Sequence, residues 1–162
     1  MRFRGTVWRY IPKGAHPLNA GYILKASGRW NRPGEYGCIY TALTRQGAEA
    51  EYEKFLIGAG VDPEHDTPRD LVTISADIRS VLDQTSQREA LVDPASPFLT
   101  GDTPGDWEKC CKLADAARQR GYAGILAPSA ALAGEKNLVI YIDATARKVK
   151  IKTGEKRIPM NY

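Results

Sequence analysis

The sequence predicts a single α+β domain built around a mixed β-sheet. Two stretches, near residues 44–60 and 103–121, combine helical spacing of apolar residues with start and stop signals. Shorter apolar runs are typical of strands, but they do not alternate strictly with helices, as a doubly wound α/β fold would require. The chain has 162 residues and no repeat, low-complexity segment or internal linker, which fits one domain over residues 1–162.

The first third of the chain predicts two strands separated by a long loop. Phe3–Ile11 mixes apolar and basic residues and is expected to form a strand that ends before Pro12. Residues 14–37 are rich in Gly, Pro, Asn and Ser and predict a loop, a kind of segment that often carries function. A short apolar strand is expected at Cys38–Leu43.

A helix is expected after this strand, capped by Thr44 and running to about Ile57, where glycines follow. Its apolar residues recur at spacings of three and four and therefore share one face. Glu51 lies at the edge of that face, whereas Glu49 and Glu53 lie at other angles and are expected to face solvent.

The middle of the chain carries weaker signals. Residues 61–69 predict a loop, and Leu71–Ala76 alternates like a half-buried strand. Residues 78–91 are mixed and predict a turn followed by a short helix, and 93–101 predict an irregular connection with two prolines.

The second helix has a well-defined start. Thr103 can cap it, Pro104 suits its first position and Asp106 faces the positive end of its dipole, while Gly121 ends it. Three strands are expected after it, the last of them an edge strand with lysines outward: Ala123–Leu126, Leu138–Ile142 and Val149–Lys152.

The composition is that of an ordinary soluble protein, with 43% hydrophobic and 26% charged residues. Met1–Arg4 lacks the apolar stretch of a secretory signal, and no run of about 18 apolar residues predicts a membrane span. Cys38, Cys110 and Cys111 form neither a disulfide framework nor a zinc motif, which predicts a reducing cytoplasm and no metal. The adjacent pair is interpreted as small apolar helix residues rather than nucleophiles.

The net charge of +4 is concentrated in a basic strand and tail at about 145–162. The preferred interpretation of this basic segment is a solvated surface. The functional alternative is an electrostatic contact with nucleic acid or with an acidic protein partner. The sequence contains no recognised nucleic-acid motif and no interleaving of aromatic and basic residues, which argues against nucleic acid.

Most of the potential chemistry lies in three separated segments. Arg29 stands in a Gly-Arg-Trp-Asn segment with Tyr40 behind it, Glu51 stands in the first helix, and Ser129 follows a strand with Asn137 nearby. A guanidinium, a ring, a carboxylate and a hydroxyl suit an anionic ligand that carries a sugar. Each residue alone also has a structural interpretation: a paired arginine, a core tyrosine, an exposed glutamate or a turn serine.

Several enzyme classes are excluded by missing motifs. The chain has no Gly-x-Gly-x-x-Gly and no Gly-x-x-x-x-Gly-Lys, which argues against Rossmann dehydrogenases and P-loop enzymes. His16 and His65 stand in no triad context, and no Gly-x-Ser-x-Gly elbow accompanies Ser129.

The order and spacing of the segments resemble the RES-domain family, toxins of bacterial toxin–antitoxin pairs and free-standing relatives. The resemblance runs through most of the chain, in five blocks: Val7–Arg9, Gly28–Tyr40, Ala48–Glu51, Asp77–Asp83 and Gly121–Ala130. It implies a fold similar to that of ADP-ribosyltransferases, with a cleft between two small sheets. It also implies NAD as substrate, consumed at its nicotinamide–ribose bond, with no separate bound cofactor.

The resemblance implies roles for individual residues. Arg29 is expected to hold the pyrophosphate and serve catalysis, with Arg9 of the first strand as a second NAD-binding arginine. Glu51 is expected to stabilise the oxocarbenium-like ribose in the transition state. Tyr40 is expected beside nicotinamide, and Ser129 beside phosphate or ribose. Asn137 completes the predicted NAD-binding set, binding NAD or positioning the serine loop.

The resulting hypothesis is an NAD-degrading enzyme whose acceptor is phosphate or water, with a separately encoded antitoxin as partner. One alternative is an ADP-ribosyltransferase that modifies a protein. Others are a basic RNA-directed toxin and a catalytically silent relative that only binds a partner. Tyr52–Lys54 supports the silent alternative, because the family usually has an aliphatic residue after the glutamate.

Overall fold

The structure is a computed structural model that describes residues 1–18, 28–32, 34–143 and 148–160. Among these residues, the α-helices are α2 (Arg45–Ala59) and α3 (Pro104–Gln119), and two short 3₁₀ turns lie at Pro63–His65 and Pro97–Leu99. The strands are β1 (Phe3–Pro12), β2 (Cys38–Ala42), β3 (Arg69–Ile78), β4 (Val81–Asp83), β5 (Gly124–Pro128), β6 (Lys136–Tyr141) and β7 (Val149–Pro159). Parts of the predicted loop at 14–37 and of the basic tail, including Arg147, lie outside the described residues.

The strands form one mixed sheet in the order β4-β5-β6-β2-β1-β3-β7. β4 and β5 are parallel and every other neighbouring pair is antiparallel. Helices and strands are not interleaved as regular βαβ units, so the predicted α+β class with a mixed sheet is confirmed.

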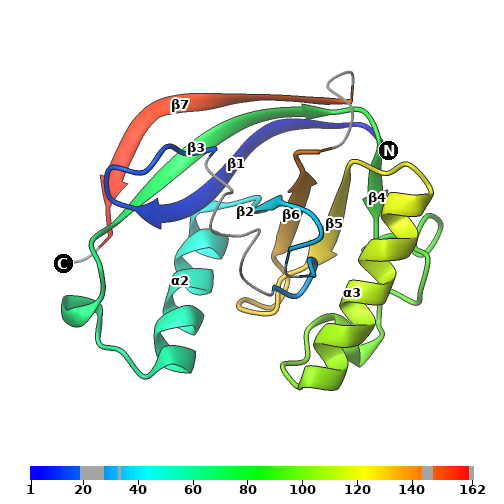
Figure 1. The fold of residues 1–162 in the computed structure, drawn as a ribbon, viewed down its shortest axis with the longest axis horizontal. Coiled ribbons are helices and arrows are strands. Elements are labelled where there is room, and N and C mark those ends of the chain that lie inside the picture. The colour runs from blue at the N-terminus through cyan, green and yellow to red at the C-terminus, as the bar shows by residue number, and fades with distance from the viewer. Residues whose placement is uncertain (19–27, 33, 144–147, 161–162) are drawn as a thin grey trace.

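The sheet nearly divides between β1 and β2. β1 pairs with β3 from Phe3 to Pro12, and β2 pairs with β6 from Cys38 to Ala42. Between β1 and β2 the only registered pair is Trp8 with Ala42. In Figure 1, β1, β3 and β7 arch over the top of the molecule, β2 lies above the upper end of α2, and β6, β5 and β4 lie to the right of that helix. The β1-β3-β7 half and the β2-β6-β5-β4 half of the sheet are therefore joined near Trp8 and Ala42, and β1 and β2 separate beyond this pair.

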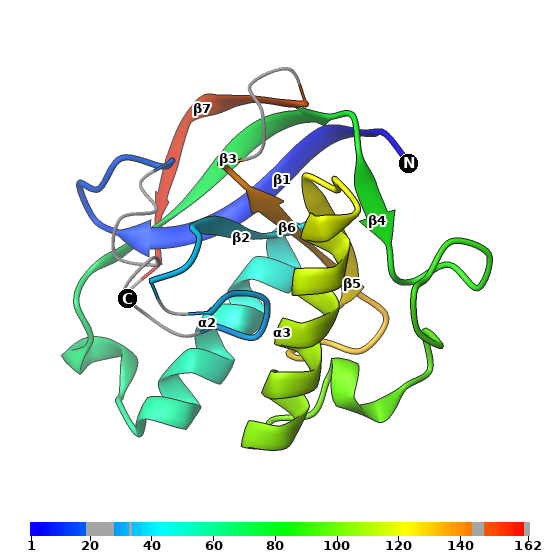
Figure 2. The same cartoon turned by 45° about the vertical axis from the view of Figure 1, so that its right-hand side comes forward.

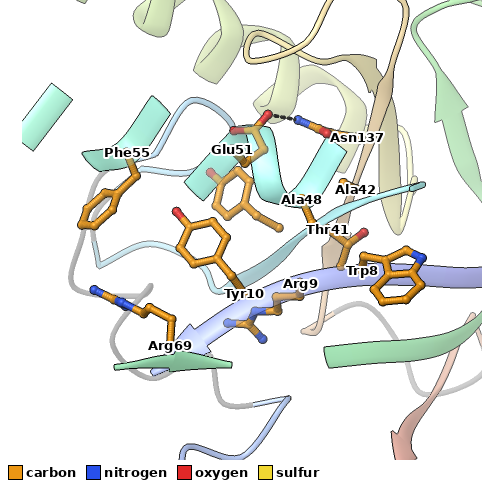
Figure 3. A pocket seen from close by; sticks show the side chains of 11 residues that line it. Trp8, Arg9, Tyr10, Thr41, Ala42, Ala48, Glu51, Phe55, Arg69 and Asn137 are labelled. Carbon is orange, nitrogen blue, oxygen red and sulfur yellow. Dashed lines mark hydrogen bonds between the residues drawn. The ribbon is translucent and has the colours of Figure 1, made fainter. Parts of the chain in front are cut away.

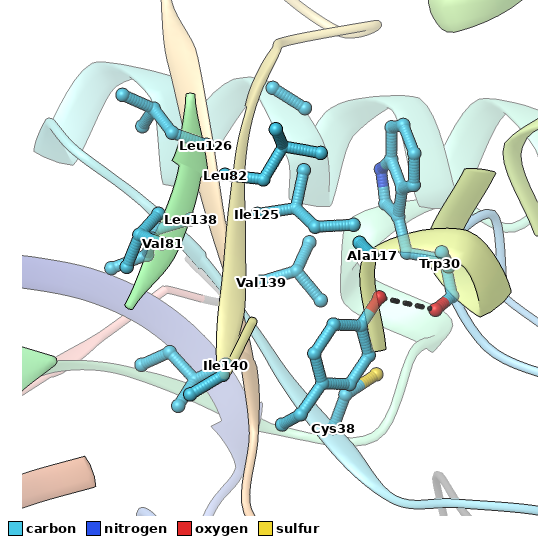
Figure 4. Packing of buried hydrophobic residues seen from close by; sticks show 14 of the residues in the cluster. Trp30, Cys38, Val81, Leu82, Ala117, Ile125, Leu126, Leu138, Val139 and Ile140 are labelled. Atoms are coloured by element: carbon cyan, nitrogen blue, oxygen red, sulfur yellow. Dashed lines mark hydrogen bonds between the residues drawn. The ribbon is translucent and has the colours of Figure 1, made fainter. Parts of the chain in front are cut away.

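The larger core lies between α3 and the β2-β6-β5-β4 half. The helix contributes the fully buried Cys110, Ala114 and Ala117, which pack against apolar strand residues such as Ile125 and Val139. Figure 2 shows α3 in front of β5 and β6, and Figure 4 shows this packing from close by. α3 begins at its predicted cap, where the Thr103 hydroxyl accepts from the Asp106 backbone N–H, and the Asp106 side chain completes a capping box.

A second, smaller core lies under α2. Ala48, Tyr52 and Leu56 are buried at helical spacing and pack with Leu71 of β3 and Met160. The helix begins at its predicted cap, where the Thr44 hydroxyl accepts from the backbone N–H of residue 47. It ends at residue 60, a glycine with a left-handed φ of 66°.

The short helix predicted within residues 78–91 is wrong. The segment forms β4 and then turns, and Val81 and Leu82 are buried in the sheet. The buried Gln84 side chain pairs with the loop backbone, donating to Val92 O at 2.6 Å and accepting from Leu91 N at 3.1 Å. A helix would pair the Leu91 N–H internally, so the Gln84 side chain competes here with helix formation.

The predicted edge strand is confirmed but is longer than the sequence indicated. β7 extends to Pro159 rather than to Lys152, and a register shift lies between Val72 and Ile74 of its neighbour. Lys150 and Lys152 are exposed on this edge. Along the described parts of the chain, neither α-helix has the length and apolarity needed to cross a membrane.

The contact between β5 and β6 leaves no room for a side chain at Gly124. A Cβ there would lie 2.7 Å from the carbonyl oxygen of Val139. We expect Gly124→Ala to lower the free energy of unfolding by about 1–3 kcal/mol, measured by urea denaturation. The matched control is Gly58→Ala in α2, where an added Cβ meets nothing within 4 Å and should raise stability by up to about 1 kcal/mol. Equal stability of the two variants would contradict this packing.

Candidate active site

A cleft lies where β1 and β2 separate. It consists of two hollows, a smaller one of about 440 Å³ and a larger one of about 750 Å³. Both volumes are typical of small-molecule sites. The hollows share five lining residues, Tyr10, Tyr40, Glu51, Phe55 and Asn137. Figure 3 shows the smaller hollow, with β1 on one side and α2 on the other.

Glu51 stands at the junction of the two hollows. Its Oε1 accepts from the Asn137 side-chain amide at 2.7 Å and from the Ser129 hydroxyl at 3.1 Å. Among the described residues, Oε2 has no hydrogen-bond partner. Three elements thus converge on one carboxylate oxygen: α2 carries Glu51, the turn that follows β5 carries Ser129, and β6 carries Asn137. The other carboxylate oxygen is available to a ligand.

Asn137 has a buried carbonyl oxygen with no partner in the described part of the chain. A carboxylate can only accept, so the NH₂ end of the amide must face Glu51 and Oδ1 must face elsewhere. An unsatisfied buried acceptor costs about 1–3 kcal/mol. A hydroxyl or amide donor of a ligand in the cleft would relieve this cost, which makes Asn137 a candidate binding residue.

Arg29 lines the larger hollow and is already paired with an anion. One guanidinium nitrogen donates to Gly101 O, and another donates to Asp102 Oδ1 at 2.9 Å. The guanidinium also lies over the Trp107 ring, 5.6 Å from its centroid. The structural and the functional interpretation of this arginine therefore coexist: it is ion-paired, and it borders the cleft.

Tyr40 organises the segment that carries Arg29. Its hydroxyl accepts from Trp30 N at 3.0 Å and donates to Asn31 Oδ1 at 2.5 Å. Burial is the main cause that raises the pKa of Tyr40 well above its ordinary value, so the phenol stays protonated and able to donate. Its ring lines both hollows, so the same side chain fixes the turn and borders the ligand space.

Ser129 lines neither hollow and reaches the cleft through Glu51, whereas Arg9 lines the smaller hollow directly. Ser129 is buried behind Glu51, and besides donating to it accepts from Ala131 N and Leu132 N, both at 3.1 Å. Its hydroxyl therefore holds the glutamate and the turn together. Arg9 lines the smaller hollow although it is only 4% exposed, and it donates to Pro17 O at 2.6 Å.

Reasoning from the sequence missed several residues of the cleft. Tyr10 lines both hollows, and its ring lies 6.4 Å from that of Phe55, which is 42% exposed. Arg69 lines the smaller hollow and lies 5.4 Å over the Phe55 ring. A signal existed for two of them, since Tyr10 follows Arg9 and Phe55 stands one helical turn after Glu51. Nothing in the sequence indicated Arg69.

The other reactive groups of the described residues line neither hollow. Cys38, Cys110 and Cys111 are buried free thiols, and burial raises the pKa of Cys38 to about 12. The same desolvation raises the pKa of the adjacent pair, which fits their interpretation as apolar helix residues. Asp62, Glu64 and His65 bring ligand atoms within 4.8 Å of one another, but all three are exposed and line neither hollow.

Comparisons with known proteins show what this chain is similar to. A family model described as RES domain matches residues 6–161. A curated protein of Mycobacterium tuberculosis, described as a probable NAD(+) phosphorylase, is 29% identical over 143 residues, which are 87% of this chain and 66% of that protein. The crystal structure of the M. tuberculosis MbcT–MbcA toxin–antitoxin complex contains a chain similar to this one, with a TM-score of 0.75 and 24% identity. That alignment covers 99% of this chain and 86% of the other, and it establishes a shared fold.

The role of Tyr40 in holding the arginine segment is open to a direct test. Tyr40→Phe removes two hydrogen bonds, so we expect the free energy of unfolding to fall by about 1–3 kcal/mol. Tyr36→Phe is the matched control, because it removes one longer bond of 3.3 Å, to Asp115, and should cost less. Thermal and urea unfolding of both variants measure the difference. A Tyr40→Phe protein as stable as the parent would contradict this role.

Proposed function

The chain belongs to the RES-domain family, and on this premise we propose that it cleaves the nicotinamide–ribose bond of NAD. The observation that carries the proposal is Glu51, a carboxylate at the centre of the cleft with one oxygen held and the other unpaired among the described residues. The description of the M. tuberculosis relative as a probable NAD(+) phosphorylase supports the same reaction.

Glu51 suits the electrostatic demand of this reaction. The carbon–nitrogen bond breaks with its electron pair leaving on nicotinamide, which departs neutral and needs no general acid. Positive charge develops on the ribose in an oxocarbenium-like transition state. A carboxylate fixed by Ser129 and Asn137 can stabilise that charge without reorganising. Asn137 Oδ1, which has no partner in the described part of the chain, can accept from a ribose hydroxyl.

The remaining groups of the cleft suit the other parts of NAD. Arg29 in the larger hollow can pair with the pyrophosphate, and Arg9 is a second arginine at the smaller one. Tyr10, Tyr40 and Phe55 provide aromatic surfaces for the nicotinamide ring. In this arrangement Ser129 acts on NAD through Glu51, since its hydroxyl is bonded to that side chain.

We propose inorganic phosphate as the acceptor, with water as the alternative. A phosphate oxygen then forms the new bond to the ribose carbon that loses nicotinamide. The name of the relative favours phosphate, although this chain aligns with only 66% of that protein's length. Transfer to a protein side chain would instead leave the ADP-ribose attached to protein, so the products distinguish the three acceptors.

The same proposal covers the fold and the partner. A sheet that nearly divides at Trp8 and Ala42 around a cleft supports a likeness to ADP-ribosyltransferases, and we treat residues 1–162 as one RES domain. The fold shared with a chain of a toxin–antitoxin complex supports a toxin that depletes NAD in the cytoplasm. Its partner would be a separately encoded antitoxin that covers the cleft.

The first experiment incubates the purified protein with NAD, with and without phosphate, and follows nicotinamide release by chromatography. We expect release that depends on phosphate and yields a phosphorylated ADP-ribose. Glu51→Gln should lower kcat by about 10²- to 10³-fold, because it removes the charge while keeping an acceptor for Ser129 and Asn137.

The matched control is Glu49→Gln on the same helix. Glu49 pairs with Arg45 at the surface and lines neither hollow, so its variant should keep the parent rate. An unchanged rate in Glu51→Gln would refute the assignment of Glu51. NAD left intact under every condition would refute the enzyme.

A further inference from the structure

One carboxylate oxygen in the larger hollow is held by two cations. Asp102 Oδ1 accepts from the Arg29 guanidinium and from the Lys54 ammonium, both at 2.9 Å. Lys54 also donates to Ala130 O at 3.0 Å, and Arg29 also donates to Gly101 O. The three charged groups come from the segment after residue 27, from α2 and from the loop before α3, and all three line the larger hollow.

The two cations and the anion differ in how firmly they are held. The Arg29 side chain is 11% exposed and that of Lys54 is 34% exposed, and each has a backbone carbonyl as second partner. The Asp102 side chain is 59% exposed, and its contacts to the two cations share a single oxygen. The anion is therefore the member of the cluster that can leave while the cations stay in place.

The geometry of the cluster matches the needs of a phosphoryl group. A phosphoryl oxygen is an anionic acceptor like a carboxylate oxygen, and a guanidinium with an ammonium is a common arrangement for holding one. Trp107 lies against Arg29 and has a buried Nε1–H without an acceptor among the described residues. A phosphoryl group has several acceptor oxygens. It can therefore accept from more donors than the single Asp102 oxygen, which now accepts from Arg29 and Lys54.

We propose that Arg29 and Lys54 form a two-cation subsite for a phosphoryl group of the substrates, and that Asp102 is an internal anion that the group must displace. The identity of the substrates rests on the function proposed above. Lys54 lies one helical turn after Glu51, so α2 presents the carboxylate for the ribose and the cation for the phosphoryl group from one rigid element. Lys54 is thus a binding residue and Asp102 sets the affinity.

An alternative role for Asp102 predicts the opposite result. If the carboxylate only orients Arg29 and Lys54 for binding, its removal should weaken the substrate. If it competes, removal should strengthen binding. Asp102→Asn keeps the shape and an acceptor oxygen but removes the charge, so the direction of the change decides between the two roles.

The kinetic test varies NAD at saturating phosphate and phosphate at saturating NAD. For the substrate that uses the subsite, we expect Asp102→Asn to lower KM by about two- to fivefold, the range of a partly exposed ion pair. We expect Lys54→Gln to raise the same KM by about tenfold, alone and in the Asp102→Asn background, as loss of a charge-assisted hydrogen bond would. A change confined to NAD assigns the subsite to its pyrophosphate, and a change confined to phosphate assigns it to the acceptor.

The matched control is Asp143→Asn, which removes an exposed carboxylate paired with Arg118 outside the cleft and should leave both KM values unchanged. Calorimetric titration with inorganic pyrophosphate gives a readout that needs no turnover. Tighter binding by Asp102→Asn and weaker binding by Lys54→Gln would support the subsite even if NAD is not cleaved. Unchanged or weaker binding by Asp102→Asn, with thermal melting showing a folded protein, would overturn the proposal.

Discussion

The candidate site depends on the single registered pair, Trp8 with Ala42, that joins β1 to β2. β1 pairs with β3 along its whole length, and β2 pairs with β6 along its whole length. Most of the backbone pairing of β1 and β2 therefore does not involve each other. A sheet twists, and strands that share one pair can separate at low cost in hydrogen bonds. α2 lies beside the separation with its small core beneath it, which leaves the Glu51 edge of the helix facing the gap. The smaller hollow is therefore a consequence of strand pairing, with lining residues that come from strands and from α2.

The polar centre of the cleft couples elements that are distant in sequence. Three side chains meet at one oxygen of the Glu51 carboxylate: Glu51 itself from α2, Ser129 from the turn that follows β5, and Asn137 from β6. A half-buried carboxylate needs such donors, so the donors that hold the site also stabilise the contact between helix and sheet. The arrangement is not fully satisfied, because Asn137 Oδ1 remains unpaired among the described residues. Retaining that cost fits a group kept for a ligand rather than for stability alone.

The sequence could predict features that depend on neighbouring residues. The caps Thr44 and Thr103 and the position of Glu51 at the edge of an apolar helix face follow from local spacing, and the structure has them. The family resemblance added the long-range association of Arg29, Glu51 and Asn137, which all line the larger hollow. The segment at 78–91 was mispredicted because a buried glutamine pairs its backbone, a contact without periodicity in sequence. The contacts of Asp102 with Arg29 and Lys54 could not be predicted for a different reason, since they join residues 73 and 48 positions apart.

The charges in the larger hollow explain why an internal anion would suit a site of this kind. Among the residues that the structure describes, its charged lining residues are Arg29, Lys54, Glu51 and Asp102, which together carry no net charge. Two cations without a counter-charge would repel each other, and water would hydrate and disperse them. The hydrogen bond from Lys54, with the charge of Arg29, lowers the pKa of Asp102, so the carboxylate remains ionised and holds both cations in place. A monovalent anion gains little by replacing an equivalent carboxylate, whereas a pyrophosphate brings two charges and more acceptor oxygens. Competition by Asp102 would thus favour the group with the higher charge, and selectivity would come from displacement rather than from a closely fitted pocket.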